Sequence, residues 1–159
     1  MRAKLGTAGA LAALGISMIV APSAHAADPV NNKQQSIHNE QTGLCLDGDY
    51  EGKVYTKACT PNNKFQQWTP VFMEAGAFKL RHAATGMCLT LVNREMITNM
   101  GCSDYYYPPQ AWYLVHDGNA NMLTTVYDGV LDSDAKGNVY PKDRTHNNRY
   151  QSWIFTEPR

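Results

Sequence analysis

Short runs of apolar and β-branched residues, without helical stripes, make up the chain beyond its first 26 residues. Examples lie at 53–56, 78–80 and 137–140, and clusters of Gly, Asn, Asp and Pro separate such runs about every 8 to 12 positions. No window in this part of the sequence places apolar residues at i, i+3, i+4 and i+7 over three turns. The pattern therefore predicts an all-β domain.

The first 26 residues have the pattern of a targeting segment. Arg2 and Lys4 precede an uncharged stretch, and the segment ends with alanines at the cleavage-determining positions 24 and 26. We expect a secretory signal peptide at 1–26 and a secreted mature chain at 27–159, with an uncleaved anchor as the alternative. The stretch is broken before it reaches the roughly 20 apolar residues of a membrane span. No second such run follows, so we expect no insertion into a membrane.

One short sequence pattern occurs three times. A Gln-Xaa-Trp triplet recurs with its tryptophans at Trp68, Trp112 and Trp153. Each triplet is preceded, 21 or 22 residues upstream of its Trp, by the end of a Gly-Xaa-Cys-Leu-Asp frame or a variant of it, at Asp47, Thr90 and Asp132. Propellers close with four or more blades, whereas three four-stranded units close into a β-trefoil. We expect three such repeats, near 37–78, 79–120 and 121–158, with the tryptophans in a shared core.

The four cysteines form two equally spaced pairs. Cys45 and Cys59 are 14 residues apart, and so are Cys88 and Cys102. Equal spacing in a chain that enters an oxidising compartment predicts two copies of one loop-closing disulfide. A zinc site is the alternative, but the knuckle spacing or paired histidines that it needs are missing from the sequence.

Charge and motifs argue against several functions. The chain has 14 Lys+Arg against 14 Asp+Glu and a pI near 6.9, which gives no basic surface for a phosphate backbone, so we expect no nucleic-acid partner. No Gly-Xaa-Ser-Xaa-Gly motif or metal-ligand spacing is found in the sequence. We therefore expect a protein that is not an enzyme and that has no catalytic residues, cofactor or metal.

Three Gln-Xaa-Trp units that open with a Gly-Xaa-Cys-Leu-Asp frame resemble the ricin B-type lectin family of β-trefoils, over residues 37–155. Segments 39–56 and 130–140 are similar, more specifically, to the repeats of the actinohivin-type lectins, which are secreted by actinomycetes and bind high-mannose glycans. The resemblance implies a secreted carbohydrate-binding lectin with a shallow sugar pocket in a repeat. Because a rim pocket open to water gains little from each hydrogen bond, we expect weak pockets that bind branched glycans or glycoproteins together, through multivalency.

The resemblance assigns one set of pocket residues to each of two repeats. An Asp accepts hydrogen bonds from sugar hydroxyls, a Tyr and an aromatic residue form a wall, and an Asn and a Gln complete the pocket. The matching residues are Asp47, Tyr55, Asn62, Phe65 and Gln66 in the first repeat and Asp132, Tyr140, Asn147, Tyr150 and Gln151 in the third. Because the connecting loops are one residue longer here, the Asn role could instead fall on Thr60 or Thr145.

Elementary chemistry supports the same carboxylates. A fixed carboxylate beside an aromatic ring suits a hexose, which offers vicinal hydroxyls and a C–H face. The alternative is that Asp47 and Asp132 only bind backbone N–H groups in their turns. The second repeat has Thr90, Thr98 and Pro109 in the place of the Asp, the Tyr and the aromatic residue, so we expect it to be packed and unable to bind sugar.

A second class of function is a protein-interaction trefoil, such as a hydrolase inhibitor or the delivery subunit of a toxin. The run Tyr105, Tyr106 and Tyr107, followed by two prolines, is unusual for a loop because exposed rigid aromatic residues are typical of protein interfaces. These tyrosines are therefore candidates for binding a protein partner. The alternative is that they cover the open end of the barrel.

Overall fold

The computed structural model describes residues 27–93, 96–118, 120–127 and 129–158. The expected signal peptide at 1–26 lies outside the described residues. Within them the chain forms twelve β-strands and four short 3-10 helices. In chain order the strands are β1 (Gln35–Asn39), β2 (Cys45–Gly48), β3 (Val54–Lys57), β4 (Gln67–Phe72), β5 (Phe78–His82), β6 (Cys88–Val92), β7 (Met96–Met100), β8 (Tyr113–Asp117), β9 (Ala120–Thr124), β10 (Val130–Ser133), β11 (Val139–Lys142) and β12 (Trp153–Thr156). The 3-10 helices are η1 (Lys64–Gln66), η2 (Glu74–Gly76), η3 (Pro108–Gln110) and η4 (Arg149–Gln151).

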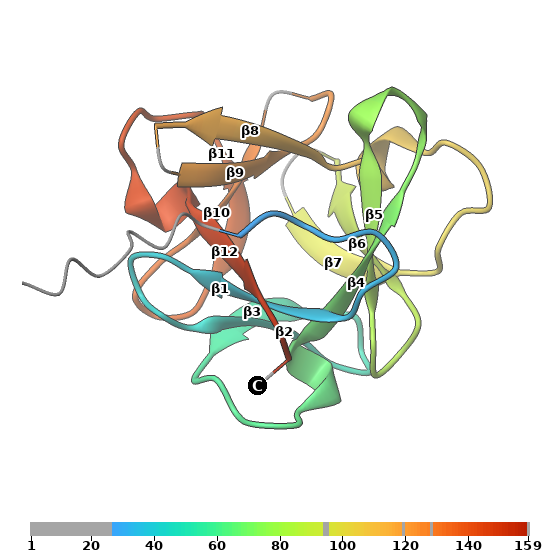
Figure 1. Ribbon diagram of the computed structural model, residues 1–159, viewed down its shortest axis with the longest axis horizontal. Coiled ribbons are helices and arrows are strands. Elements are labelled where there is room, and N and C mark those ends of the chain that lie inside the picture. Colours follow the sequence, from blue (N-terminus) through green and yellow to red (C-terminus); the bar gives the residue numbers. More distant parts are fainter. Residues whose placement is uncertain (1–26, 94–95, 119, 128, 159) are drawn as a thin grey trace, which may run out of the picture.

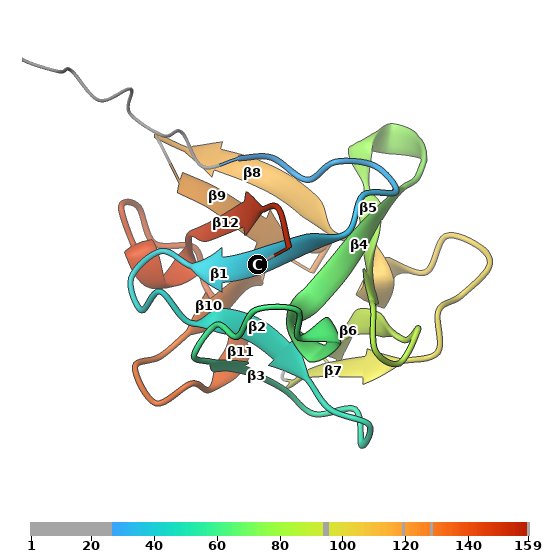
Figure 2. The same ribbon diagram turned by 60° about the horizontal axis from the view of Figure 1, so that its bottom comes forward.

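The strands form three units of four, as the sequence repeats predict (Figure 1). In each unit the second and third strands form an antiparallel hairpin: β2 with β3, β6 with β7, and β10 with β11. The last strand of one unit pairs with the first strand of the next, as in β4 with β5 and β8 with β9. The ring closes where β12 pairs with β1, and Figure 2 shows these two strands side by side. The all-β prediction is confirmed, and the architecture is a β-trefoil.

The three tryptophans hold equivalent positions in the core. Each indole is at most 1% exposed. Each Nε1–H donates a hydrogen bond of 2.9 Å to the backbone oxygen of the leucine in its own upstream frame: Trp68 to Leu46, Trp112 to Leu89 and Trp153 to Leu131. A buried indole nitrogen needs such a partner, so the distance from frame to triplet is fixed by the fold. The prediction that the tryptophans form the core is confirmed.

Both expected disulfides are present. Cys45 is bonded to Cys59 and Cys88 to Cys102, with Cα atoms 5.1 and 5.0 Å apart. Each bridge joins the first residue of a hairpin to the loop that follows the hairpin. In the third unit Val130 takes the place of the first cysteine, so that hairpin has no disulfide.

Two tight turns fix the hairpins of neighbouring units against one another. Gly52 and Gly137 have φ values of +88° and +89°, and a Cβ atom there would lie 2.9 Å and 2.6 Å from a backbone oxygen of the adjacent unit. The two glycine carbonyls accept hydrogen bonds from the backbone N–H groups of Asn99 (2.9 Å) and Thr56 (2.8 Å). Only glycine fits this combination of left-handed backbone and close approach. The turns therefore hold in place the hairpins that carry the candidate site.

Candidate functional site

The predicted carboxylates and tyrosines face each other across hairpins. Asp47 on β2 is the register partner of Tyr55 on β3, and Asp132 on β10 is the register partner of Tyr140 on β11. Directly opposite residues on an antiparallel pair bring their side chains to the same face of the sheet. The spacing of eight residues in the sequence thus becomes a direct neighbour relation in space.

The glutamine of each Gln-Xaa-Trp triplet is buried, and its side-chain amide is hydrogen-bonded to neighbouring protein groups. Gln66 donates through Nε2 to Asp47 Oδ2 (3.0 Å) and to the backbone oxygen of Ala58 (2.9 Å), and its Oε1 accepts from the backbone N–H of Thr60 (2.8 Å). Its hydrogen-bonding atoms are thus already bound to protein groups. The structure places Gln66 where it orients the carboxylate and closes the loop.

The same pair of hydrogen bonds from the glutamine to the loop backbone recurs in the third repeat. Gln151 is fully buried, donates to the backbone oxygen of Asp143 (2.8 Å) and accepts from the backbone N–H of Thr145 (2.9 Å). Gln110 does the same in the second repeat, with the backbone groups of Gly101 and Ser103. Because the hydrogen-bonded glutamine is present in all three repeats, it has a structural role in the fold as well as a place beside a pocket.

Burial makes the two candidate carboxylates costly to ionise. Asp47 and Asp132 are only 3% and 2% exposed. Desolvation raises the pKa of each above its ordinary value, and for Asp47 the hydrogen bond that Gln66 donates offsets part of this effect. The ammonium of Lys142 also lowers the pKa of Asp132, as that of Lys57 does for Asp47. These are buried acceptors whose charged forms would gain from a hydrogen-bond donor.

The turn-holding role falls to a different pair of carboxylates. Asp49 accepts from the backbone N–H groups of Glu51 and Lys53, both at 2.9 Å. Asp134 accepts from the backbone N–H groups two and four residues on, at 2.8 and 3.0 Å. Among the hydrogen bonds of the described residues, none joins a backbone N–H to Asp47 or Asp132, so the alternative that these two hold the turns is not what the structure shows.

The third repeat contains an open pocket at the predicted place. A cavity of about 230 Å³ is lined by Asp132, Ser133, Asp134, Ala135, Tyr140, Lys142, Asn148 and Tyr150. Asp132 Oδ2 is buried there with no hydrogen-bond partner among the described residues. Buried polar atoms are nearly always paired in folded proteins, so such an atom on a residue that lines a pocket indicates a ligand or an ordered water.

The asparagine of this pocket is one residue further along than expected. Asn148 lines the cavity, and its side chain accepts from the backbone N–H of Tyr150 (3.1 Å), which caps η4. Asn147 instead has a left-handed backbone (φ 56°), and its N–H donates to Asp117 (3.3 Å). The N-cap preference of asparagine before the Arg-Tyr-Gln segment is the signal that could have distinguished them.

The first repeat shows the same asparagine shift. Asn63 caps η1 by accepting from the backbone N–H of Phe65 (3.1 Å), whereas Asn62 is exposed with a φ of 58°. The ring of Phe65 makes an edge contact with the exposed ring of Tyr50, at 5.0 Å between centroids. Ala135 takes the place of Tyr50 in the third repeat, so the first repeat carries an additional aromatic ring beside its pocket residues.

The second repeat has lost its carboxylate but is not closed. Thr90 is buried, and its hydroxyl donates to the backbone oxygen of Cys88 (2.8 Å) and accepts from Gln110 (3.1 Å). A cavity of about 480 Å³ nevertheless opens above it, lined by Thr90, Leu91, Val92, Asn93, Met100, Tyr107, Pro109 and Tyr127. The core of the unit is packed as expected, because Leu89, Gln110 and Trp112 are at most 1% exposed, but its surface carries this cavity.

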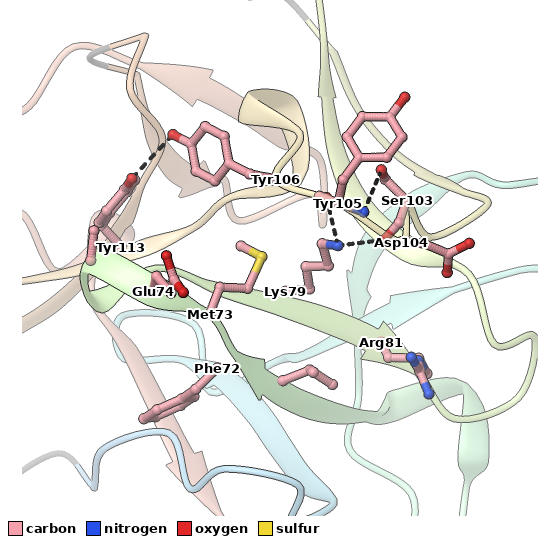
Figure 3. A pocket seen from close by; sticks show the side chains of 12 residues that line it. Phe72, Met73, Glu74, Lys79, Arg81, Ser103, Asp104, Tyr105, Tyr106 and Tyr113 are labelled. Carbon is pink, nitrogen blue, oxygen red and sulfur yellow. Dashed lines mark hydrogen bonds between the residues drawn. The ribbon is translucent and has the colours of Figure 1, made fainter.

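A third and larger cavity lies away from the two hairpin cavities described above. It measures about 680 Å³ and runs between the outer face of β4 and β5 and the loop at 103–106 (Figure 3). The buried Lys79 holds the loop by donating to the backbone oxygens of Ser103 and Tyr105. Tyr105 and Tyr106 are 73% and 50% exposed beside this groove, so they do not act as a buried cap over the barrel.

The described residues contain no group of three or more His, Cys, Asp or Glu side chains that could hold a metal ion. In the same part of the chain, no helix is long and apolar enough to cross a membrane.

Solved structures share this fold at low sequence identity. A designed threefold-symmetric protein, ThreeFoil, superposes with a TM-score of 0.69 at 20% identity, covering 78% of this chain and 98% of that one. A ricin B-like lectin from Macrolepiota procera in complex with lactose gives 0.69 at 20% identity, with coverage of 83% and 100%. An endo-β-galactosidase from Clostridium perfringens that releases GlcNAcα1-4Gal gives 0.69 at 18% identity, and the match covers 77% of this chain and 31% of the enzyme. These likenesses establish the trefoil fold.

A sequence comparison identifies the family. Among curated proteins none matches this chain in sequence. The sequence model of the cytolethal distending toxin A/C domain, however, matches residues 21–114, which is more than half of the chain. This segment spans the first repeat, the disulfide-bonded hairpin of the second and the loop that carries the three tyrosines. The chain therefore belongs to the cytolethal distending toxin A/C domain family.

Proposed function

We propose that this protein is a secreted, non-catalytic carbohydrate-binding module that holds sugars in the pockets of its first and third repeats. The observation that carries the proposal is that Asp132 lines an open cavity together with Tyr140 and Tyr150, and that its buried Oδ2 has no hydrogen-bond partner among the described residues. The lactose complex of the Macrolepiota lectin, which shares the fold, is consistent with this assignment.

Sugar hydroxyls are donors that such a site lacks. A hydrogen bond to a charged acceptor contributes about 1.5–3 kcal/mol, against about 1 kcal/mol for a neutral pair. The aromatic walls would pack against the C–H face of the same ring. Lys142 and Asn148 at the rim are donors for the sugar oxygens that the carboxylate cannot bind.

We infer that the ligands are mannose-type glycans, because the hairpin segments resemble those of the actinohivin-type lectins. Each pocket alone would bind weakly, since a rim site open to water gains little from each hydrogen bond. A branched glycan that reaches both acidic pockets would bind about 10² to 10⁴ times more tightly without new contacts. The two disulfides suit an extracellular protein.

The test is a glycan array probed with the wild-type protein and with the double variant Asp47→Asn, Asp132→Asn. We expect the wild type to bind high-mannose glycans and the double variant to lose this binding. Asp143→Asn is the control, because it also removes an acidic charge from the third repeat but lies outside the cavity lining. Equal binding by the double variant and the wild type would contradict the proposal.

The family match favours a second candidate function, that of a binding subunit in a toxin assembly. The groove in Figure 3, with Tyr105 and Tyr106 exposed on one side and Phe72 on the other, would then receive the partner protein. Exposed aromatic residues are typical anchors of protein interfaces. A partner that is captured by the wild type and by the double Asp variant, but not by Tyr105→Ser with Tyr106→Ser, would support this function. A partner that is retained by the Tyr variant would count against it.

A further inference from the structure

The groove beside the loop at 103–106 contains two cationic side chains that have no anionic partner. Lys79 and Arg81 are two residues apart on β5, so both side chains lie on the same face of the sheet, and both line the groove. Lys79 is only 8% exposed, and its ammonium donates to the backbone oxygens of Ser103 and Tyr105. No ion pair of the described residues includes either cation. A buried ammonium that is bonded only to carbonyl groups keeps an uncompensated positive charge.

The two cations still have hydrogen-bond donors to offer. An ammonium group has three N–H donors, and Lys79 uses two of them within the protein. The Arg81 side chain is exposed, and among the described residues none accepts a hydrogen bond from its guanidinium. The planar fork of a guanidinium fits a carboxylate, which can accept two parallel hydrogen bonds. This end of the groove therefore suits a carboxylate.

Away from the cations the groove has apolar walls. Val71 on β4 is the register partner of Lys79, and Met73 lies two residues further along, so both side chains continue the same face of the sheet. Figure 3 shows Met73, Tyr106 and Tyr113 around the end of the cavity that is opposite Arg81, and the two tyrosine hydroxyls are hydrogen-bonded at 3.2 Å. Because Arg81 pairs with position 69, four residues before Met73, the two ends are about 13 Å apart along the strand. The volume of about 680 Å³ is typical of a pocket for a small molecule.

The charges of the described lining favour a ligand with a single negative charge. Glu74 and Asp104 are exposed side chains that also line the groove, so they balance the charges of Lys79 and Arg81. A dianion such as phosphate would be repelled by these two carboxylates. A monoanion can bind the two cations with less repulsion, and its remaining part can be uncharged. The groove therefore suits a molecule with one carboxylate and an apolar body.

We propose that this groove binds a small amphipathic monocarboxylate of the class of the medium-chain fatty acids. The carboxylate lies at Arg81 and Lys79, and the chain lies over Val71 and Met73, below Tyr106. The carboxylate supplies the counter-ion that the buried ammonium lacks, and the chain gains free energy with the apolar area that it buries. The site goes beyond the proposed sugar binding and does not use the acidic pockets. An acidic segment of a partner protein offers the same carboxylate but no alkyl chain, so the dependence of affinity on chain length distinguishes the two sources.

The experiment is calorimetric titration of the full chain with butyrate, hexanoate and octanoate, and with hexanamide as the neutral match of hexanoate. We expect each added methylene group to lower the dissociation constant about two- to fourfold. We expect hexanoate to bind about tenfold more tightly than hexanamide, because the carboxylate makes charge-assisted hydrogen bonds. Affinity that does not depend on chain length, equal binding of hexanoate and hexanamide, or no binding of octanoate would each overturn the proposal.

Variants test the two ends of the groove separately. Arg81→Gln should abolish the preference for hexanoate over hexanamide, whereas Arg144→Gln, the matched change outside the groove lining, should leave it unchanged. Met73→Gln should keep this preference and reduce the gain for each methylene group. Asp47→Asn with Asp132→Asn should bind hexanoate as the wild type does, so the outcome is independent of the glycan array. An Arg81→Gln protein that still prefers hexanoate would refute the site.

The position of the ligand can also be measured without a variant. Thermal unfolding shows whether each variant is folded, and if Arg81→Gln is not, NMR titration of the isotope-labelled wild type with octanoate replaces it. We expect the largest shift changes at residues 71–81 and 103–106. Shift changes confined to the hairpins β2–β3 and β10–β11 would place the carboxylate in the sugar pockets and refute the proposal.

Discussion

Asp132 on β10 lies directly opposite Tyr140 on β11, and its buried Oδ2 has no hydrogen-bond partner among the described residues. Asp132→Asn keeps the shape of the side chain and removes its charge, so each hydrogen bond from a sugar loses about 1–1.5 kcal/mol. We expect about tenfold weaker binding of a monovalent mannoside to the third repeat, measured by calorimetry with Asp47→Asn as the background. Tyr140→Phe keeps the ring and should have a smaller effect. If the two variants bind as well as the background, the pair does not contact sugar.

The charged carboxylate of Asp132 should lower the free energy of unfolding at neutral pH. Burial raises the pKa of Asp132 in the folded protein above its value in the unfolded chain. The folded state therefore binds more protons between the two values, and folding becomes less favourable as the pH rises through this window. At pH values above this window the full loss of stability is present. At pH values below the ordinary aspartate pKa the carboxyl is protonated in both states and causes no loss.

We expect Asp132→Asn to have a higher free energy of unfolding than the wild type at pH 7 and an equal one at about pH 3, which lies below the ordinary aspartate pKa. Chemical denaturation at the two pH values measures the difference. A variant that is less stable at pH 7 would show that the carboxylate is paired and stabilising, against the geometry described above.

The triplet glutamine should stabilise the repeat even where no pocket carboxylate exists. Gln110→Leu removes the hydrogen bonds to the backbone groups of Gly101 and Ser103 and leaves the buried Thr90 hydroxyl without its donor. The expected loss is about 1–3 kcal/mol for each unpaired group. Gln66→Leu should cost a similar amount in the first repeat. A loss confined to Gln66 would instead assign the glutamine mainly to the pocket.

Each disulfide should stabilise its own hairpin. Replacing Cys45 and Cys59 with alanine releases a loop of about 15 residues, which costs about 3 kcal/mol of stability by the loop-entropy estimate. Because Asp47 follows on the same strand, sugar binding by the first repeat should weaken as well. The matched change at Cys88 and Cys102 should lower stability without affecting the acidic pockets. Equal loss of binding in both variants would point to a general loosening of the fold.

The sequence predicts the parts of this protein that repeat. The spacing between frame and Trp is set by a hydrogen bond from each indole to a leucine carbonyl, so a threefold period leads directly to the trefoil and its core. The Asp and Tyr of a hairpin are likewise related by strand register.

The sequence does not predict the details of the loops or the cavity of the second repeat. Asn148, not Asn147, lines the pocket because Asn148 caps the 3-10 helix η4. The loop is one residue longer than in the resembling repeats, so sequence spacing alone does not identify which asparagine does so. The groove beside Tyr105 needs Lys79 to hold the loop from a strand 24 residues away in sequence from Ser103. The cavity of the second repeat is lined by Thr90 and Pro109, and the motif shows that these residues are replaced but not that a cavity lies beside them.

The central claim is tested most directly by NMR titration of the isotope-labelled protein with methyl α-mannoside. We predict that the largest shift changes fall on the hairpins β2–β3 and β10–β11, at Asp47, Tyr55, Asp132 and Tyr140. Shift changes confined to residues 103–107, or none up to saturating sugar, would contradict the account.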